Sequence, residues 1–129
     1  LAPDNLNIGY LTIQKTASLL AAEIRVLAVP VSVDVLPLSG EIEDMGTNAA
    51  LGVERVNGQI ERLYSLFAVE ALHSTRAIGL RQLEDKSVTL GAETGKLFSA
   101  ITAVVPAVSD DRAQGPDIEA VAKVLAAHR

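Results

Sequence analysis

The longest regular pattern of apolar and polar positions runs from about Met45 to Leu80 and predicts one unbroken helix. Apolar residues recur there at alternating steps of three and four, which places them in a single stripe along a helix. The stripe is formed by Val53, Val56, Ile60, Leu63 and Phe67, and is widened by Leu66, Val69 and Leu72. The remaining surface is assigned to the polar residues Glu54, Arg55, Gln59, Glu61, Arg62 and Arg76.

The length of this helix exceeds what the chain can cover. Roughly 33 residues at about 1.5 Å each give a rod on the order of 50 Å long. A compact domain of 129 residues has a diameter of roughly 36 Å. The apolar stripe therefore needs helices from elsewhere, and the pattern indicates a piece of a larger bundle.

The rest of the chain predicts further helices and one long connection. Ile8–Leu27 has the apolar spacing of a first helix, and Ala92–Val105 that of a third. A last helix opens with Pro116 in its first turn. The stretch Ala28–Asp44, with two interior prolines and alternating valines, finds no second strand to pair with, so we interpret it as an extended, half-buried loop. Residues 1–129 are thus predicted to form a single all-α segment.

The composition of the chain limits the kinds of partner that it can bind. Hydrophobic residues make up 49% of the chain and the mean hydropathy is +0.30, which favours burial against a membrane or a protein. The longest uncharged stretch, Leu97–Ser109, is about 13 residues, whereas a membrane span needs ~20. A net charge of −5 with scattered basic residues argues against nucleic acid. The absence of cysteine excludes disulfides and thiolate metal sites, and is compatible with the cytoplasm.

The densest acidic group, Glu41, Glu43 and Asp44, lies between the extended loop and the long helix. One interpretation is placement at the positive end of the helix dipole, with Asp44 or Thr47 as the cap. The other is a carboxylate held beside the amino or imidazole group of a ligand. Metal binding is not expected, because two distant histidines give no ligand spacing. His73 is interpreted as a packed or surface histidine.

Three segments, in order, resemble histidine ammonia-lyase and its aromatic amino-acid lyase relatives. "IGYLTIQKTASLLAAEIRVLAVPVSVDVLPLSGEIED" resembles the region with the glycine-aromatic-x-x-x-Gln helix, the P-x-S-V-D loop and the Gln-Glu-Asp motif. "IERLYSLFAVEALHSTRAIGLR" is similar to the long central helix of that family. "DDRAQGPDIEAVAKVLAAHR" is similar to the D-R-x-x-x-P-D-I-E-x-V ending of histidine ammonia-lyases.

The resemblance implies a fragment, about the C-terminal quarter, of a helical homotetramer of the ammonia-lyase fold. It also implies a methylidene-imidazolone electrophile made from an Ala-Ser-Gly tripeptide, which this chain lacks. By position, Glu43 would contact the substrate, with Asp44, Asp34 and Gln14 as supporting motif residues. No catalytic residue is assigned within this chain. Ile42 departs from the Gln of the family, and Met45, Gly46 and Thr47 replace its usual His-Val-Ser.

The activity that the resemblance implies is loss of ammonia from L-histidine to give urocanate, a step of histidine catabolism in the cytoplasm. The partners would be a small amino-acid substrate and the remainder of the same polypeptide, with the isolated 129 residues inactive. Two alternatives stay open. One is a tyrosine or phenylalanine ammonia-lyase or aminomutase of the same family. The other is a non-catalytic helical assembly module.

Overall fold

The computed structural model describes residues 11–33, 42, 46–108 and 112–128. In this part of the chain the regular structure is helical, without strands, as the sequence predicts. The helices are α1 (Ile13–Leu27), the 3₁₀ turn η1 (Val31–Val33), α2 (Ala49–Glu84), α3 (Ala92–Thr102) and α4 (Gly115–Ala127). Among them, no helix is both long and apolar enough to cross a bilayer.

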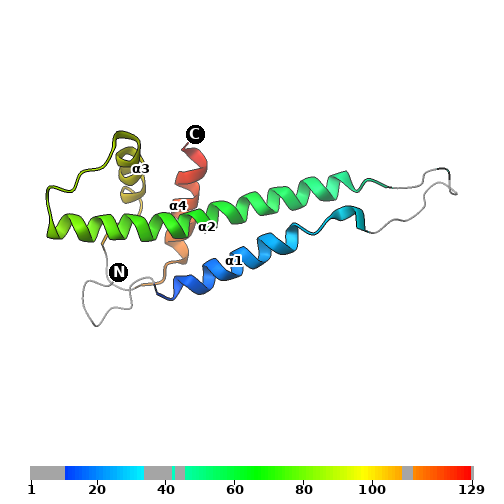
Figure 1. Ribbon diagram of the computed structural model, residues 1–129, viewed down its shortest axis with the longest axis horizontal. Helices are drawn as coiled ribbons and strands as arrows, with labels where there is room; N and C mark the ends of the chain where they lie inside the picture. Colours follow the sequence, from blue (N-terminus) through cyan, green and yellow to red (C-terminus); the bar gives the residue numbers. More distant parts are fainter. Residues whose placement is uncertain (1–10, 34–41, 43–45, 109–111, 129) are drawn as a thin grey trace.

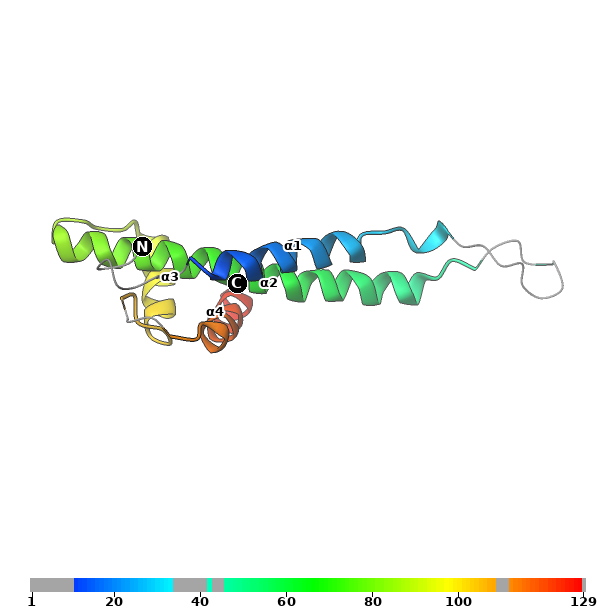
Figure 2. The same ribbon diagram turned by 90° about the horizontal axis from the view of Figure 1, so that it is seen from below.

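The molecule is organised along α2, which forms its long axis (Figure 1). With 36 residues, this helix is about 54 Å long at about 1.5 Å per residue. α1 runs beside α2 in both views, whereas α3 and α4 lie against the half of α2 that ends at Glu84 (Figure 2). The other half of α2 therefore has only α1 and the short turn η1 as neighbours within the described chain.

The apolar core lies where α2 meets α4, α3 and the beginning of α1. Its buried members are Ile13, Ala68, Val69, Leu72, Ile101, Val105, Ile118 and Val121. None of the buried residues of α2 precedes Ala68. Most apolar side chains of the stripe before that point are exposed instead, with exposed fractions of 62% for Val53 and 53% for Phe67, while Leu63 and Leu66 are half-buried. The expected shortage of covering helices is thus visible in the described structure.

The helix boundaries differ from those expected in several places. α1 begins at Ile13, later than the expected Ile8, because residues 11 and 12 form a turn. α2 begins and ends about four residues later than expected, and α3 ends at Thr102. The extended interpretation of the loop is wrong for Val31–Val33, which form a 3₁₀ turn. The last helix carries Pro116 in its first turn, as predicted.

Two expectations for individual residues of α2 are wrong. The residue that caps its N-terminus is Asn48, and not Asp44 or Thr47. Arg76, assigned to the polar surface, is only 1% exposed and is the largest fully buried side chain among the described residues. The reason is that the covering of this half of α2 comes from α3 and α4, and the pattern of one helix alone does not reveal where others cross it.

Candidate functional site

The structure places one of the four predicted site residues. Gln14 is the second residue of α1 and is exposed. Glu43, Asp44 and Asp34 lie outside the described residues, as does Glu41 of the acidic group. The geometry that bears on the acidic segment is therefore that of its two flanks, which are described: residues 28–33 before it and residues 46–48 after it.

The two flanks are joined by a hydrogen bond from Asn48. The side-chain amide Nδ2 of Asn48 donates to the main-chain carbonyl of Val31 at 3.1 Å. Asn48 has φ 51° and ψ 28°, which is the left-handed region. Asparagine is among the few residues other than glycine that adopt this conformation at low cost. The chain thus turns into α2 and contacts the first residue of η1 at the same residue.

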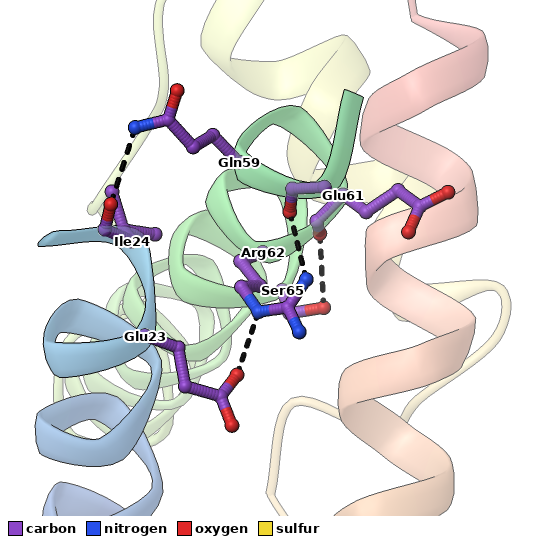
Figure 3. A network of polar contacts seen from close by, with 7 residues as sticks. Glu23, Ile24, Gln59, Glu61, Arg62 and Ser65 are labelled. Atoms are coloured by element: carbon purple, nitrogen blue, oxygen red, sulfur yellow. Dashed lines mark hydrogen bonds and ion pairs between the residues drawn. The ribbon is translucent and has the colours of Figure 1, made fainter. Parts of the chain in front are cut away.

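Two further polar side chains of α2 bind main-chain carbonyls near the end of α1. Nη1 of Arg55 donates to the carbonyl of Val29 at 2.6 Å. Nε2 of Gln59 donates to the carbonyl of Ile24 at 3.1 Å (Figure 3). Residues 48, 55 and 59 are seven and four positions apart, so their side chains lie on one face of the helix. This face holds the segment that leads towards the acidic residues.

An ion pair lies on the same face of α2, closer to the middle of this helix. Nε of Arg62 lies 2.7 Å from Oε2 of Glu23, and Nη1 of Arg62 donates to the carbonyl of Gly58 at 3.0 Å (Figure 3). A Cβ atom at position 58 would lie 3.3 Å from both Nη1 of Arg62 and Cδ1 of Leu27. The missing side chain of Gly58 therefore lets α1 and the guanidinium group approach α2 closely. Because both charged side chains are half-exposed, the pair fixes geometry more than it stabilises the fold.

A hollow of about 460 Å³ lies beside this face and involves Leu27 of α1. Its charged lining residues are Glu54, Arg55, Glu61 and Arg62. Two acidic and two basic side chains give no net charge that would select an ionic ligand. Among the residues that the structure describes, no group of three or more His, Asp or Glu side chains is arranged to hold a metal ion.

The ending that resembles D-R-x-x-x-P-D-I-E-x-V has a structural role in the described chain. Nη2 of Arg112 lies 2.7 Å from Oδ2 of Asp117, a carboxylate in the first turn of α4. Asp117 is buried, and Ile118 and Val121 after it belong to the core. The ion pair and the two apolar side chains fix α4 where it packs on α2. His73, at the same half of α2, directs Nδ1 to the carbonyl of Val69 at 2.9 Å, as a packed helix residue does.

The sequence did not predict the three residues whose side chains bind main-chain carbonyls. Arg55 and Gln59 were assigned only to the remaining helix surface, and Asn48 was not singled out. The signal that could have found them is their spacing on one helix face, next to a segment with Pro30. Glu23 was not singled out either, and the structure shows that its carboxylate pairs with Arg62.

Comparison with known proteins identifies the family. The family described as "Aromatic amino acid lyase" matches residues 1–103. This chain belongs to that family. The relationship confirms the resemblance found in the sequence, and the helical architecture of the described residues agrees with that of a solved histidine ammonia-lyase.

Curated relatives include histidine ammonia-lyases from two bacteria. The one from Chloroflexus aurantiacus is 33% identical over 125 residues, which is 94% of this chain and 23% of that protein. The one from Shewanella sediminis is 33% identical over 120 residues, which is 93% of this chain and 23% of that protein. The chain thus spans about a quarter of the length of the curated relatives it matches.

Two solved structures resemble the chain over nearly its whole length. The ergothioneine degrading enzyme ergothionase from Treponema denticola is 32% identical, with a TM-score of 0.87, covering 98% of this chain and 25% of that one. Histidine ammonia-lyase from Trypanosoma cruzi has a TM-score of 0.86 at 24% identity, covering 98% of this chain and 24% of that one. The latter likeness is one of fold.

Proposed function

We propose that the protein to which this chain belongs is an ammonia-lyase that eliminates ammonia from L-histidine and releases urocanate. The observation that carries the proposal is the 33% identity to histidine ammonia-lyases across 94% of the chain, together with the family match. Because the chain spans about a quarter of those relatives, the activity is proposed for the whole protein. The isolated 129 residues are expected to be inactive.

The proposal includes an electrophile that these residues do not form. The chain contains no Ala-Ser-Gly tripeptide, so a methylidene-imidazolone would come from another part of the protein. Such a group would activate the substrate for loss of its amino group. The contribution proposed for this chain is substrate binding and the support of the binding segment.

Glu43 is the residue proposed to bind the substrate. A carboxylate there would accept a charge-assisted hydrogen bond from a protonatable imidazole, and such bonds are stronger than those between neutral groups. An amide at the same place would lose that preference. Asp44, Asp34 and Gln14 are proposed to support the segment, as in the family motifs they match.

A homotetramer is the assembly proposed for the whole protein. The support is the row of exposed apolar side chains on the half of α2 that the described chain leaves uncovered, which includes Val56, Ile60 and Phe67. A contiguous apolar face of this kind is typical of an interface. α1 adds exposed Leu19 and Val26 to the uncovered surface.

A second candidate substrate is ergothioneine, a histidine derivative that keeps the imidazole-type ring. The observation that favours it is the likeness to ergothionase, whose 32% identity nearly equals that of the histidine ammonia-lyases. Both candidates place a five-membered nitrogen ring in the site. Tyrosine or phenylalanine turnover, and a non-catalytic assembly role, are the remaining alternatives.

The experiment compares substrates on the full-length protein, following urocanate, cinnamate-type products and ergothioneine consumption by ultraviolet absorbance. We expect urocanate from L-histidine, and a decrease in kcat/KM of about 10²-fold for Glu43→Gln, in the range for loss of a hydrogen bond to a charged group. Glu41→Gln is the matched control and should change kcat/KM by less than about threefold.

Three results would contradict the proposal. Cinnamate-type products would indicate an aromatic substrate. Equal effects of the two substitutions would show that Glu43 is not the binding carboxylate. A full-length protein that assembles, turns over none of these substrates and lacks the near-ultraviolet absorbance of the electrophile would support the non-catalytic alternative.

A further inference from the structure

The open half of α2 carries its apolar side chains in the repeat of a coiled coil. Starting from the first residue of the helix, apolar positions follow at steps of four, three, four, three and four residues. These six positions, which we call the α2 seam, are Ala49, Val53, Val56, Ile60, Leu63 and Phe67. Steps that alternate between three and four form a line along which a second helix packs at a shallow angle. Glu70 holds the next position of the repeat, is exposed, and ends the seam.

α1 does not occupy the seam. Its polar contacts with this half of α2 involve Arg55, Gln59 and Arg62. These side chains lie on a face about a third of a turn away from the seam, at about 3.6 residues per turn. The exposed fractions in the middle of the seam are accordingly 52% for Val56 and 45% for Ile60. A second helix can therefore approach the seam while α1 stays in place.

A hollow in the seam has the form that a packed helix requires. It measures about 250 Å³ and is lined by Ile60, Leu63, Tyr64 and Phe67. These residues are spaced i, i+3, i+4 and i+7, so they surround one point on the surface of the helix. In a coiled coil, four residues arranged in this way form the hole that receives one side chain of the facing helix.

The sizes of the seam residues favour an antiparallel copy of α2 as that facing helix. The seam begins with the small Ala49 and ends with the large Phe67. In an antiparallel pair centred on residue 58, a smaller residue always lies opposite a larger one: Ala49 opposite Phe67, Val53 opposite Leu63, and Val56 opposite Ile60. Packed helices keep an axis separation of about 8–10 Å, which such pairs hold even along the seam. A parallel copy would put two Phe67 rings at one end and two Ala49 methyl groups at the other.

The charges favour the same arrangement. A parallel copy would bring the exposed Glu70 beside its own equivalent, and like charges at such short distance repel. In the antiparallel pair centred on residue 58, Glu70 lies beyond Ala49 of the other helix, whereas a shift of seven residues would place it against Val53. The positions that flank the seam are uncharged, so two copies of a chain with a net charge of −5 meet there without repulsion. They are Asn57, Gln59, Tyr64 and Leu66.

The same register names the side chain that enters the hollow. The centre of the hollow lies level with Leu63 and Tyr64, and therefore opposite Val53 of the second copy. Among the exposed large apolar residues of the seam, Val53 has the largest exposed fraction, 62%. A two-fold axis repeats the contact, so that the hollow of the second copy receives Val53 of the first. One chain thus supplies both the hollow and the side chain that fills it.

We propose that the α2 seam binds the α2 seam of a second copy of this chain, antiparallel and about a two-fold axis near residue 58. This inference rests on the homotetramer of the proposed function, because it needs a second copy in the assembly. It adds which faces meet, in which direction and in which register. The identity of the substrate does not enter it.

The test introduces cysteine pairs into the full-length protein, in a background whose other cysteines are replaced; residues 1–129 contain none. Val53→Cys and Leu63→Cys, combined in one chain, would face each other across the two-fold axis. The two positions lie about 15 Å apart along one helix, at about 1.5 Å per residue. They cannot join within one chain, because a disulfide needs Cα atoms within about 7 Å.

The expected result is a covalent dimer that needs both cysteines. After mild oxidation, a non-reducing gel should show at least about tenfold more dimer for the double variant than for either single variant, whose two cysteines would lie about 15 Å apart. The matched control is Glu54→Cys with Glu61→Cys, because both positions are exposed and line the hollow beside α1. This pair should yield no more dimer than the single variants.

A charge exchange measures the same register without oxidation. Leu63→Glu should weaken association of the full-length protein at least about tenfold, because it sets a carboxylate against an apolar side chain of the second copy. Adding Val53→Lys should recover at least about threefold of that loss, since the ammonium group would lie opposite the new carboxylate. Adding Val56→Lys instead should recover none, because residue 56 faces Ile60. Sedimentation of a dilution series measures the three association constants.

Three results would overturn the inference. Covalent dimer from Val53→Cys alone would show that the helices run parallel. Equal yields from the seam pair and from the control pair would show that the cysteines meet only by random collision. An assembled protein whose seam pair forms no dimer would show that the seam does not meet its copy, and slow reaction of these cysteines with a thiol reagent would then identify another part of the protein as its cover.

These outcomes separate the inference from the proposed function. Turnover of histidine tests the activity and plays no part in the cross-linking. A full-length protein that stays monomeric contradicts the proposed homotetramer and this inference together. A protein that assembles without the seam cross-link leaves the homotetramer standing, and only the inference fails.

Discussion

The two halves of α2 carry similar apolar side chains and meet different surroundings. From Ala68 to Gly79 the helix is packed between α4, α3 and α1, and Leu72 is only 2% exposed. From Ala49 to Phe67 it has α1 and the short turn η1 at its side within the described chain (Figure 1), and Val53, Val56 and Ile60 are exposed. The difference lies in the elements that the chain supplies for covering, because the apolar stripe itself runs through both halves.

The polar contacts of the two halves of α2 also differ. In the open half, Arg55, Gln59 and Arg62 bind main-chain carbonyls or a half-exposed carboxylate of α1. In the covered half, the ion pair between Arg112 and buried Asp117 fixes α4. The open half thus uses polar side chains to position a connection, and the covered half uses apolar packing to hold the fold. In the proposed assembly, other parts of the protein would cover the open stripe.

The largest expected effect comes from cutting back one apolar side chain in each half of the 129-residue chain. Leu72→Ala should lower the free energy of unfolding by about 2–5 kcal/mol, because it leaves a cavity in the core. Ile60→Ala should change it by less than about 0.5 kcal/mol, as for an exposed site. Urea unfolding at low protein concentration measures both values.

The same pair of substitutions in the full-length protein sharpens the comparison. If the open stripe is covered there by other helices, the loss for Ile60→Ala should rise to about 2–4 kcal/mol, within the range for buried apolar truncations. A loss that stays below about 0.5 kcal/mol would mean that the stripe is exposed in the whole protein as well. The homotetramer proposal would then lose its structural support.

A smaller effect is expected at the end of the covered half. A Cβ atom at Gly79 would lie 2.8 Å from Cβ of Ala107 and 3.2 Å from Cγ2 of Val108. Gly79→Ala should therefore lower the free energy of unfolding by about 1–3 kcal/mol, since the segment after α3 has to move away. Thermal or urea unfolding of the chain measures the change.

Gly95→Ala provides the matched control, in the interior of α3. A Cβ atom there would meet only Cβ of Leu90, at an ordinary 3.8 Å. Because alanine favours the helix, this substitution should raise the free energy of unfolding by about 0.5–1 kcal/mol. The packing account of Gly79 would be wrong if both substitutions proved stabilising.

The helices were predictable from the sequence because their apolar spacing is local information. The spacing of Val53, Val56 and Ile60 specifies a helix without reference to what lies beside it. The start of α2 at Ala49 was not predicted, because it depends on a left-handed residue, Asn48, that no periodicity records. The burial of Arg76 was not predicted either, because it depends on where α3 and α4 cross.

The candidate site was predicted from the resemblance to the family, and the structure describes only the residues on either side of it. Glu43, Asp44 and Asp34 came from family motifs and lie outside the described residues. The contacts of Asn48, Arg55 and Gln59 were missed because their partners are main-chain carbonyls. Because every residue has a main-chain carbonyl, the sequence does not indicate which carbonyl such a side chain binds. The relation between the two flanks therefore required the fold.

The smallest expected effect concerns the end of α2 opposite to Asn48. The Ser87 hydroxyl and the Ser87 N–H donate to Oδ1 of Asp85 at 2.7 and 2.8 Å, and they hold the pKa of Asp85 below its ordinary value of 3.8. A carboxyl whose pKa is lowered by folding stabilises the native state above pH 3.8, and this contribution is lost as the pH falls through the native pKa. Ser87→Ala should shift the pKa of Asp85 upward, since the hydroxyl is the largest cause, while the remaining N–H keeps it somewhat low. NMR titration of aspartate-labelled protein measures this shift, with Ser65→Ala as the control because Ser65 Oγ binds only the Glu61 carbonyl. An Asp85 pKa that does not respond to Ser87→Ala would show that the Ser87 hydroxyl does not stabilise the ionised carboxylate.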